Sequence, residues 1–155
     1  MKLQPGRTIV GMTRFAVALL CMLPAMKAVA AESLIEAGEW KVTSTGVVNG
    51  TTSPPQAKSR CITPEQAGNV AATFGPVSGT VNSDCAAPTI EAAGKTLKWR
   101  LQCRGQLDID AAAEFTFDSP RHYTAVITSK GKMAGALISD VRTDIVAERV
   151  GDCAQ

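Results

Sequence analysis

Chemically reactive side chains are scarce in this sequence. The 155 residues include one histidine, His122, and contain no C-x-x-C, H-E-x-x-H or G-x-S-x-G motif. Zinc and copper sites need several histidine, cysteine or methionine ligands, and a hydrolytic triad needs a nucleophile beside an oriented histidine. Beyond residue 30, His122 and Met133 are the only histidine and methionine. We therefore predict no metal, no other cofactor and no catalytic residue, and we interpret His122 as a solvated residue of a turn at residues 118–122.

Long hydrophobic runs are also missing, apart from residues 15–26. That run has 12 residues, whereas a membrane-spanning helix needs about 20. Arg7 and Arg14 supply positive charge before and at the start of the run, and residues 28–30 read Ala-Val-Ala, a small-x-small pattern that a signal peptidase recognises. We interpret residues 1–30 as a cleavable Sec-type signal peptide, which predicts a periplasmic protein without a transmembrane segment after cleavage.

Two alternatives for this N-terminal segment differ in how it begins and ends. Met12 is a second possible start, because the segment that follows it is a compact signal by itself. Cys21 raises the possibility of a lipoprotein. Leu20 is bulky where a lipidation site needs a small residue before the cysteine, so lipidation is disfavoured.

Positive charge is missing from the chain that remains after cleavage. The whole sequence is formally +2, but residues 1–30 carry four basic residues and no acid. Residues 31–155 hold 12 basic and 14 acidic residues, a net charge of −2. This balance predicts no surface that binds nucleic acid and none that binds an anionic membrane.

Alternating apolar and polar residues dominate the chain after residue 39. This period of two is typical of strands, and turn residues interrupt it at short intervals. Asn49-Gly50 fits a type I′ turn that leads into a return strand at residues 56–62. We predict one disulfide-stabilised domain over residues 31–155. Its fold class is mainly β, an antiparallel meander that forms a β-sandwich or a partly closed β-barrel.

One short helix is predicted after the return strand. Thr63 is a suitable N-cap, Pro64 suits the first turn, and Gln66 can complete a capping box. The helix then continues over residues 67–74 and ends before Gly75-Pro76.

The best-defined hairpin has its turn at Gly105. A register centred there pairs Trp99 with Ala111 and Arg100 with Asp110. Asp108, Asp110 and Glu114 then share one face of a strand. Paired carboxylates can serve glycoside hydrolysis, but we interpret this face as solvated and salt-bridged. Further turns are predicted at residues 118–122 and at Gly131.

Four cysteines remain in the predicted domain, and they allow three pairings. In an exported chain with a β pattern, an even number of cysteines predicts disulfides. A hairpin that turns at residues 93–95 places Cys85 opposite Cys103, which leaves Cys61 for Cys153. In this register Ile90 points outward, so a bulge near Pro88 is expected to shift the phase.

The order of four motifs resembles a known family. They are Gly38-Glu39-Trp40-Lys41-Val42-Thr43, Cys61-Ile62-Thr63-Pro64-Glu65, Trp99-Arg100-Leu101-Gln102-Cys103-Arg104-Gly105 and Arg149-Val150-Gly151-Asp152-Cys153. In this order they resemble a family of small exported bacterial proteins known as domain of unknown function 3617. The resemblance implies a periplasmic or envelope location. It implies no activity and no catalytic residues.

Two functions follow from this reading. The first is a non-enzymatic envelope protein that binds another protein or the cell wall. The second is a carrier of a small apolar or lipidic ligand inside the curved sheet, because small residues are expected to line its inner face. These small residues are Ala111, Ala113, Ala125, Ala134, Gly135 and Ala136.

Overall fold

Strands with alternating burial form most of the structure. A computed structural model describes residues 33–77 and 83–154 of the chain, and all of them belong to one unit that spans residues 31–155. The predicted signal peptide at residues 1–30, including Cys21, lies outside the described residues. Within the described ranges, no helix combines the length and the apolar character that crossing a membrane requires.

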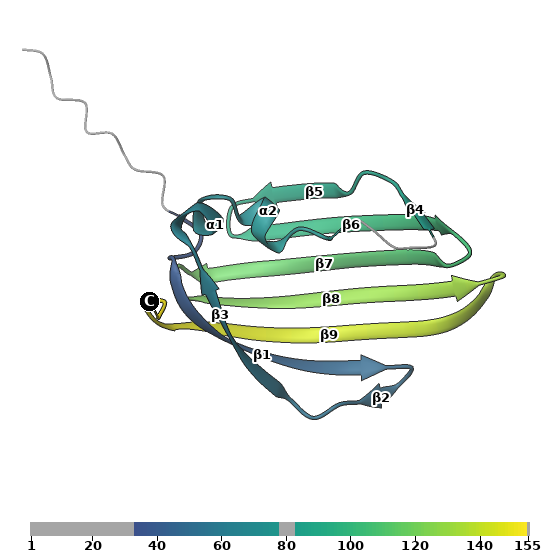
Figure 1. The fold of residues 1–155 in the computed structure, drawn as a ribbon, viewed down its shortest axis with the longest axis horizontal. Coiled ribbons are helices and arrows are strands. Elements are labelled where there is room, and N and C mark those ends of the chain that lie inside the picture. Colours follow the sequence, from purple (N-terminus) through teal and green to yellow (C-terminus); the bar gives the residue numbers. More distant parts are fainter. Residues whose placement is uncertain (1–32, 78–82, 155) are drawn as a thin grey trace, which may run out of the picture. The chain divides into compact units, whose positions relative to one another are not determined.

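The strands form one antiparallel sheet in the order β2-β1-β9-β8-β7-β6-β4, with β3 beside β1 and β5 beside β6 (Figure 1). The predicted mainly β fold and antiparallel meander are confirmed, and the sheet is not closed. The elements are β1 (Gly38–Val48), β2 (Thr51–Thr52), β3 (Gln56–Ile62), α1 (Pro64–Gly68), α2 (Val70–Phe74), β4 (Ser83–Cys85), β5 (Thr89–Ala93), β6 (Thr96–Gly105), β7 (Asp108–Ser119), β8 (His122–Met133) and β9 (Ala136–Gly151).

The turn at Asn49-Gly50 is confirmed. Both residues have positive φ, 49° and 82°, as a type I′ turn requires. Val48 pairs with Thr51 across this turn. The return strand is β3, which pairs with β1 over its whole length and has the predicted bounds.

The predicted helix is divided into two. Thr63 caps α1, and the capping box with Gln66 is present. Asn69 then interrupts the helix, because its backbone lies outside the helical region at φ −131°. Its side-chain oxygen accepts a hydrogen bond from the backbone N–H of Ala72 at 3.1 Å. A side chain that caps a new helix in this way competes with continuation of the old one.

The register predicted for the Gly105 hairpin is wrong by two residues. Trp99 pairs with Ala113 instead of Ala111, and Arg100 pairs with Ala112 instead of Asp110. The expected large-against-small contact survives with a different alanine. A shift of two leaves every side chain on its predicted face, which is why the burial pattern of β6 still matches.

The predicted shift of phase near Pro88 is present. Cys85 pairs with Cys103 in β4, whereas Ile90 pairs with Trp99 in β5. The two registers differ by one residue, so the extra residue lies between Cys85 and Thr89. Ile90 therefore shares a face with the buried Trp99 rather than pointing outward, although it remains 40% exposed.

The turn predicted at Gly131 is also wrong. Gly131 lies within β8 opposite Ser139 on β9, and the chain turns at Ala134 and Gly135, whose φ values are 51° and 81°. Ala134, Gly135 and Ala136 are exposed. They do not belong to the inner face, where Ala113 and Ala125 are buried as expected.

Aromatic side chains fill one face of the sheet, here called the core face. The helices α1 and α2 lie against this face at one end of the sheet (Figure 1). Phe74 of α2 contacts Phe115, Phe117 and Tyr123, with ring centroids 5.1–5.6 Å apart. The Trp99 Nε1–H donates to the carbonyl of Phe74 at 2.9 Å. Burial of this apolar area stabilises the fold by about 25 cal/mol per Å².

Two disulfides cross-link the domain. One links Cys85 to Cys103 within neighbouring strands, and the other links Cys61 of β3 to Cys153 near the C-terminus. The same pairs were expected from the spacing of the cysteines. The second bond closes a loop with a sequence separation of 92 residues.

Candidate functional site

A groove of about 670 Å³ crosses the face of the sheet opposite the helices, here called the open face. It extends from Thr89 on β5 across β6, β7 and β8 to Arg142 on β9. Neighbouring strands lie about 4.8 Å apart, so these five strands give the groove a length of roughly 19 Å.

The groove exists because short side chains lie between long ones. The pairing of the strands places Arg100, Ala112, Thr128 and Arg142 in one row across the sheet. Ala112 and Thr128 form the floor, and the two arginines stand at its ends. On neighbouring rows, Thr116, Thr124 and Val126 continue this low floor.

The rim of the groove carries both signs of charge. Lys98 forms an ion pair with Glu114 at 3.1 Å, and Arg142 forms one with Asp144 at 2.7 Å. These side chains are about half exposed, so each pair contributes little to stability. Among the residues that the structure describes, Arg100 forms no ion pair, which leaves one cation of the rim open to a ligand.

Two of the carboxylates singled out in the sequence, Asp108 and Asp110, accept hydrogen bonds from neighbouring groups. Asp110 accepts hydrogen bonds from Arg104 at 2.8 Å and Gln102 at 3.0 Å, and these donors hold its pKa below the ordinary value. The prediction that Arg100 pairs with Asp110 is wrong, because Arg104 forms the ion pair with Asp110. The solvated, salt-bridged character of this face is confirmed. The Asp108 carboxylate accepts from the backbone N–H of Gly105.

His122 lies at the turn between β7 and β8, outside the groove. Its Nδ1 lies 2.7 Å from the Asp118 carboxylate, and this hydrogen bond lowers the pKa of Asp118. The His122 side chain is 30% exposed. No group of three or more His, Cys, Asp or Glu residues suited to a metal ion occurs in the described ranges.

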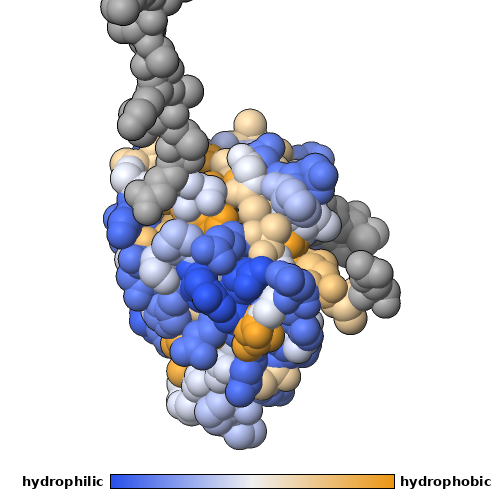
Figure 2. All heavy atoms as spheres, turned by 90° about the vertical axis from the view of Figure 1, so that its left-hand side faces the viewer, coloured by the Kyte–Doolittle hydropathy of each residue, from blue (hydrophilic) through white to orange (hydrophobic). Residues whose placement is uncertain are grey.

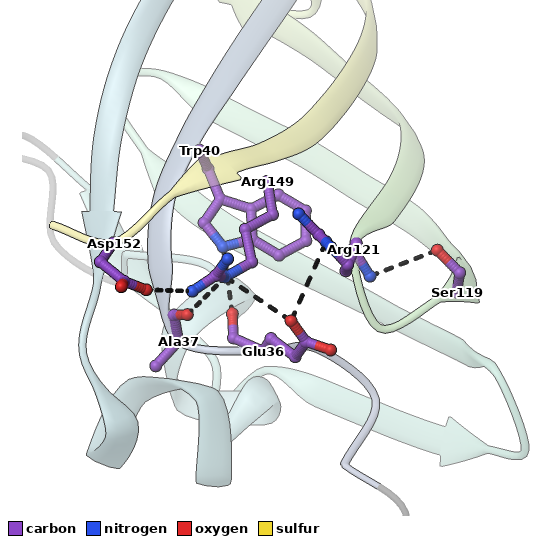
Figure 3. Close-up of polar contacts among 7 residues, drawn as sticks. All are labelled: Glu36, Ala37, Trp40, Ser119, Arg121, Arg149 and Asp152. Carbon is purple, nitrogen blue, oxygen red and sulfur yellow. Dashed lines mark hydrogen bonds and ion pairs between the residues drawn. The ribbon is translucent and has the colours of Figure 1, made fainter.

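Residues of the first and last sequence motifs meet at one end of the sheet (Figure 3). Arg149 donates to the carbonyl of Ala37 at 2.7 Å and to Asp152 at 2.6 Å. Its Nε also lies 3.7 Å from the Glu36 carboxylate, while the Trp40 indole donates to the Glu36 carbonyl at 3.1 Å. We call these residues, together with Arg121, the Arg149 cluster.

The Arg149 cluster joins the beginning and the end of the domain. Gly38, beside it, has φ +143°, and a Cβ atom there would collide with the carbonyl of Gly151 and the guanidinium of Arg149. From this end, hydrophilic side chains gather over the middle of the surface (Figure 2). The contacts satisfy backbone carbonyl groups and hold residues 36–40 against residues 149–152, so we assign a structural role to these motif residues.

A family model described as a protein of unknown function, DUF3617, matches residues 35–153. The chain belongs to this family. The DUF3617 match begins at Ile35, which is fully buried, and ends at Cys153, which is part of a disulfide. The DUF3617 domain is therefore the β-domain described above. Neither the curated proteins nor the solved structures contain a match to this chain.

The groove was missed from the sequence, although its residues fall on predicted strands. Ala112 and Thr128 are short residues at positions that the alternation assigns to the solvent side, where long polar side chains are common. These short residues at solvent-side positions were the only signal in the sequence that could have indicated the groove. It identifies a groove only when the order and register of five strands are known, because these decide which side chains are neighbours.

Proposed function

We propose that this DUF3617 protein is an exported, non-enzymatic binding protein of the periplasm. The groove on the open face holds an extended segment of a protein partner. A length of roughly 19 Å accommodates about six residues of extended chain at 3.3 Å each. The groove across β5–β9 is the observation that carries this proposal.

The chemistry of the groove favours a peptide over an apolar ligand. Threonine hydroxyls on the floor can bond to backbone groups, and Ala112 and Val126 offer apolar contact. The rim carries both signs of charge, which suits a chain of mixed side chains. Arg100 selects an acidic group in that segment, because its guanidinium forms paired hydrogen bonds with a carboxylate.

Export and the absence of catalysis rest on the sulfur atoms and on His122. All four cysteines of the domain form disulfides, which persist in oxidising compartments such as the periplasm. A cysteine in a disulfide is not a nucleophile. His122 points to Asp118 at an exposed turn, so the groove receives no general base from it.

A photo-crosslinking amino acid at position 128 tests the groove in living cells. The matched control is position 43, also a partly buried threonine on the open face but outside the groove. We expect one discrete protein adduct from position 128 and none from position 43. Arg100→Glu should abolish the adduct, whereas Lys41→Glu, an equal change of charge outside the groove, should preserve it.

Adducts of equal pattern at both positions, or an adduct that survives Arg100→Glu, would show that the groove is not a specific binding site. Adducts with cell-wall polymer instead of protein would show that the groove binds a cell-wall ligand rather than a protein partner. Free thiols in the purified protein would remove the argument for export.

The second candidate is a carrier of a small apolar ligand on the core face. Ile109, Ile127 and Ile145 favour it, because they are only partly buried on that face. The aromatic cluster around Phe74 already fills the end covered by the helices. Native mass spectrometry of the protein purified from cells separates the two candidates, since a carrier retains a small molecule and the groove protein does not.

A further inference from the structure

The hairpin between β8 and β9 projects beyond both neighbouring strands. β7 pairs with β8 only as far as Asp108 opposite Lys132, and β1 pairs with β9 only as far as Val48 opposite Val141. Asn49 adds hydrogen bonds to Asp140. Residues 133–138, here called the β8–β9 tip, therefore have no lateral strand partner within the described part of the chain.

The β8–β9 tip is apolar on both faces. Met133 pairs with Ala136 and lies on one face, whereas Leu137 pairs with Lys132 and lies on the other. Ile138 is the unpaired residue of a bulge between the pair Lys132–Leu137 and the pair Gly131–Ser139. Met133, Leu137 and Ile138 are 52%, 53% and 49% exposed. Ala134 and Gly135 both have positive φ, as in the type I′ turns that favour tight hairpins, so the turn defines the conformation of the tip.

This geometry suits a lipid surface better than a protein surface. A protein partner would cover one face of the tip and leave the other exposed. Three half-exposed side chains also fall far below the roughly 800 Å² that each partner contributes to a stable protein interface. Insertion into a bilayer buries both faces at once, because lipid surrounds whatever enters it.

The charges behind the tip fit the same arrangement. Between residues 129 and 138 the only charged residues are Lys130 and Lys132. Lys130 forms an ion pair with Asp140 at 3.5 Å. Lys132 lies opposite Asp108 in the sheet but forms no ion pair in the described residues. It lies level with Leu137, with which it pairs, and its long apolar stem lets the ammonium group reach the lipid headgroups while Leu137 enters the acyl boundary.

We propose that the β8–β9 tip anchors this protein to the surface of a membrane with anionic lipids. Met133, Leu137 and Ile138 enter the acyl boundary, and Lys132 contacts the headgroups. The contact is local, which is compatible with the net charge of −2 over residues 31–155. It leaves the groove on the open face free, so the two sites act independently.

Vesicle partitioning tests the anchor. The protein is expressed with its own N-terminal segment and purified in the form that the cell leaves it. It is then mixed with vesicles of phosphatidylethanolamine and phosphatidylglycerol in a 3:1 ratio. Leu137→Ser with Ile138→Ser should lower the partition coefficient at least tenfold. Val146→Ser with Val150→Ser, which changes two apolar residues of similar exposure far from the tip, should leave it unchanged.

A charge variant tests the headgroup contact separately. Lys132→Ala should weaken binding to the anionic vesicles about fivefold, the equivalent of about 1 kcal/mol per lysine. It should not change the weaker binding to neutral phosphatidylcholine vesicles. Circular dichroism and intact disulfides establish that each variant is folded.

Three results would overturn the proposal. They are no partitioning by the unmodified protein, equal partitioning by the tip variant and its control, or a tip variant that changes the oligomeric state in sedimentation without changing partitioning. The last result would assign the tip to a second copy of the chain. None of them bears on the crosslinking at position 128, so failure of the anchor and failure of the groove are distinguishable.

Discussion

The backbone of Gly38 is tightly constrained. Its φ of +143° lies in a region that side chains rarely adopt, and a Cβ atom would collide with Gly151 and Arg149. Gly50 also has a positive φ, +82°, but open space surrounds it. Substitutions at the two positions therefore distinguish the cost of backbone strain alone, at Gly50, from the cost of strain plus steric collision, at Gly38.

We expect Gly38→Ala to destabilise the protein by about 3 kcal/mol, because strain and collision add. Gly50→Ala should cost about 1 kcal/mol, the strain alone. Urea unfolding followed by tryptophan fluorescence measures both. Equal losses in the two variants would show that the contact between Gly38 and the Arg149 cluster is not restrictive.

At the scale of elements, the period of two predicts which face of a strand each side chain lies on better than it predicts which residues pair across neighbouring strands. The alternation along β6 places Leu97, Trp99 and Leu101 on one face, and all three are buried. It paired Arg100 with Asp110, which is wrong, because a shift of two residues preserves every face. Turn chemistry predicted Asn49-Gly50, where both residues tolerate positive φ. It failed at Gly131, because the alternation continues to Met133 and Ala134 supplies the turn.

The break between α1 and α2 yields a prediction for Asn69. Asn69→Ala removes the oxygen that accepts from the Ala72 N–H, so we expect a loss of about 1 kcal/mol. Asn69→Asp keeps that acceptor and should stay within a few tenths of the original stability. The fluorescence of Trp99, whose indole donates to Phe74 at the end of α2, reports unfolding in urea. An Asn69→Ala variant as stable as the original protein, or an Asn69→Asp variant destabilised as much as Asn69→Ala, would contradict the capping role of Asn69.

At the scale of the whole molecule, the sequence indicated the fold class and the cysteine pairs but not the candidate site. Cys85 and Cys103 could be paired because they are symmetric about a turn close in sequence. The groove brings Thr89 and Arg142 to one surface through four strand pairings. Each pairing depends on tertiary packing that no local pattern contains. The β8–β9 tip likewise required knowing where the neighbouring strands end.

The disulfide between Cys61 and Cys153 should stabilise the protein mainly by lowering the conformational entropy of the unfolded chain. Cys61 is exposed, so removal of the bond costs little packing. A loop with a sequence separation of 92 residues gives a chain-entropy loss of about 4.6 kcal/mol. We expect Cys61→Ala with Cys153→Ala to lower the unfolding free energy by about that amount.

The urea dependence distinguishes this mechanism from a lost surface contact. A freed unfolded chain exposes more surface, so the m-value should rise in the double variant. A loss below about 1 kcal/mol with an unchanged m-value would show that the bond does not restrict the unfolded chain.

The position of β9 has a consequence for how the protein is made. β9 follows every other described strand in the sequence, yet it lies between β1 and β8 in the sheet. The hairpins of β1–β3 and β4–β8 can form early, but nothing in the sheet joins them until residues 136–151 arrive. The two halves of the domain are therefore not joined in the sheet until β9 has been made and takes its place between them.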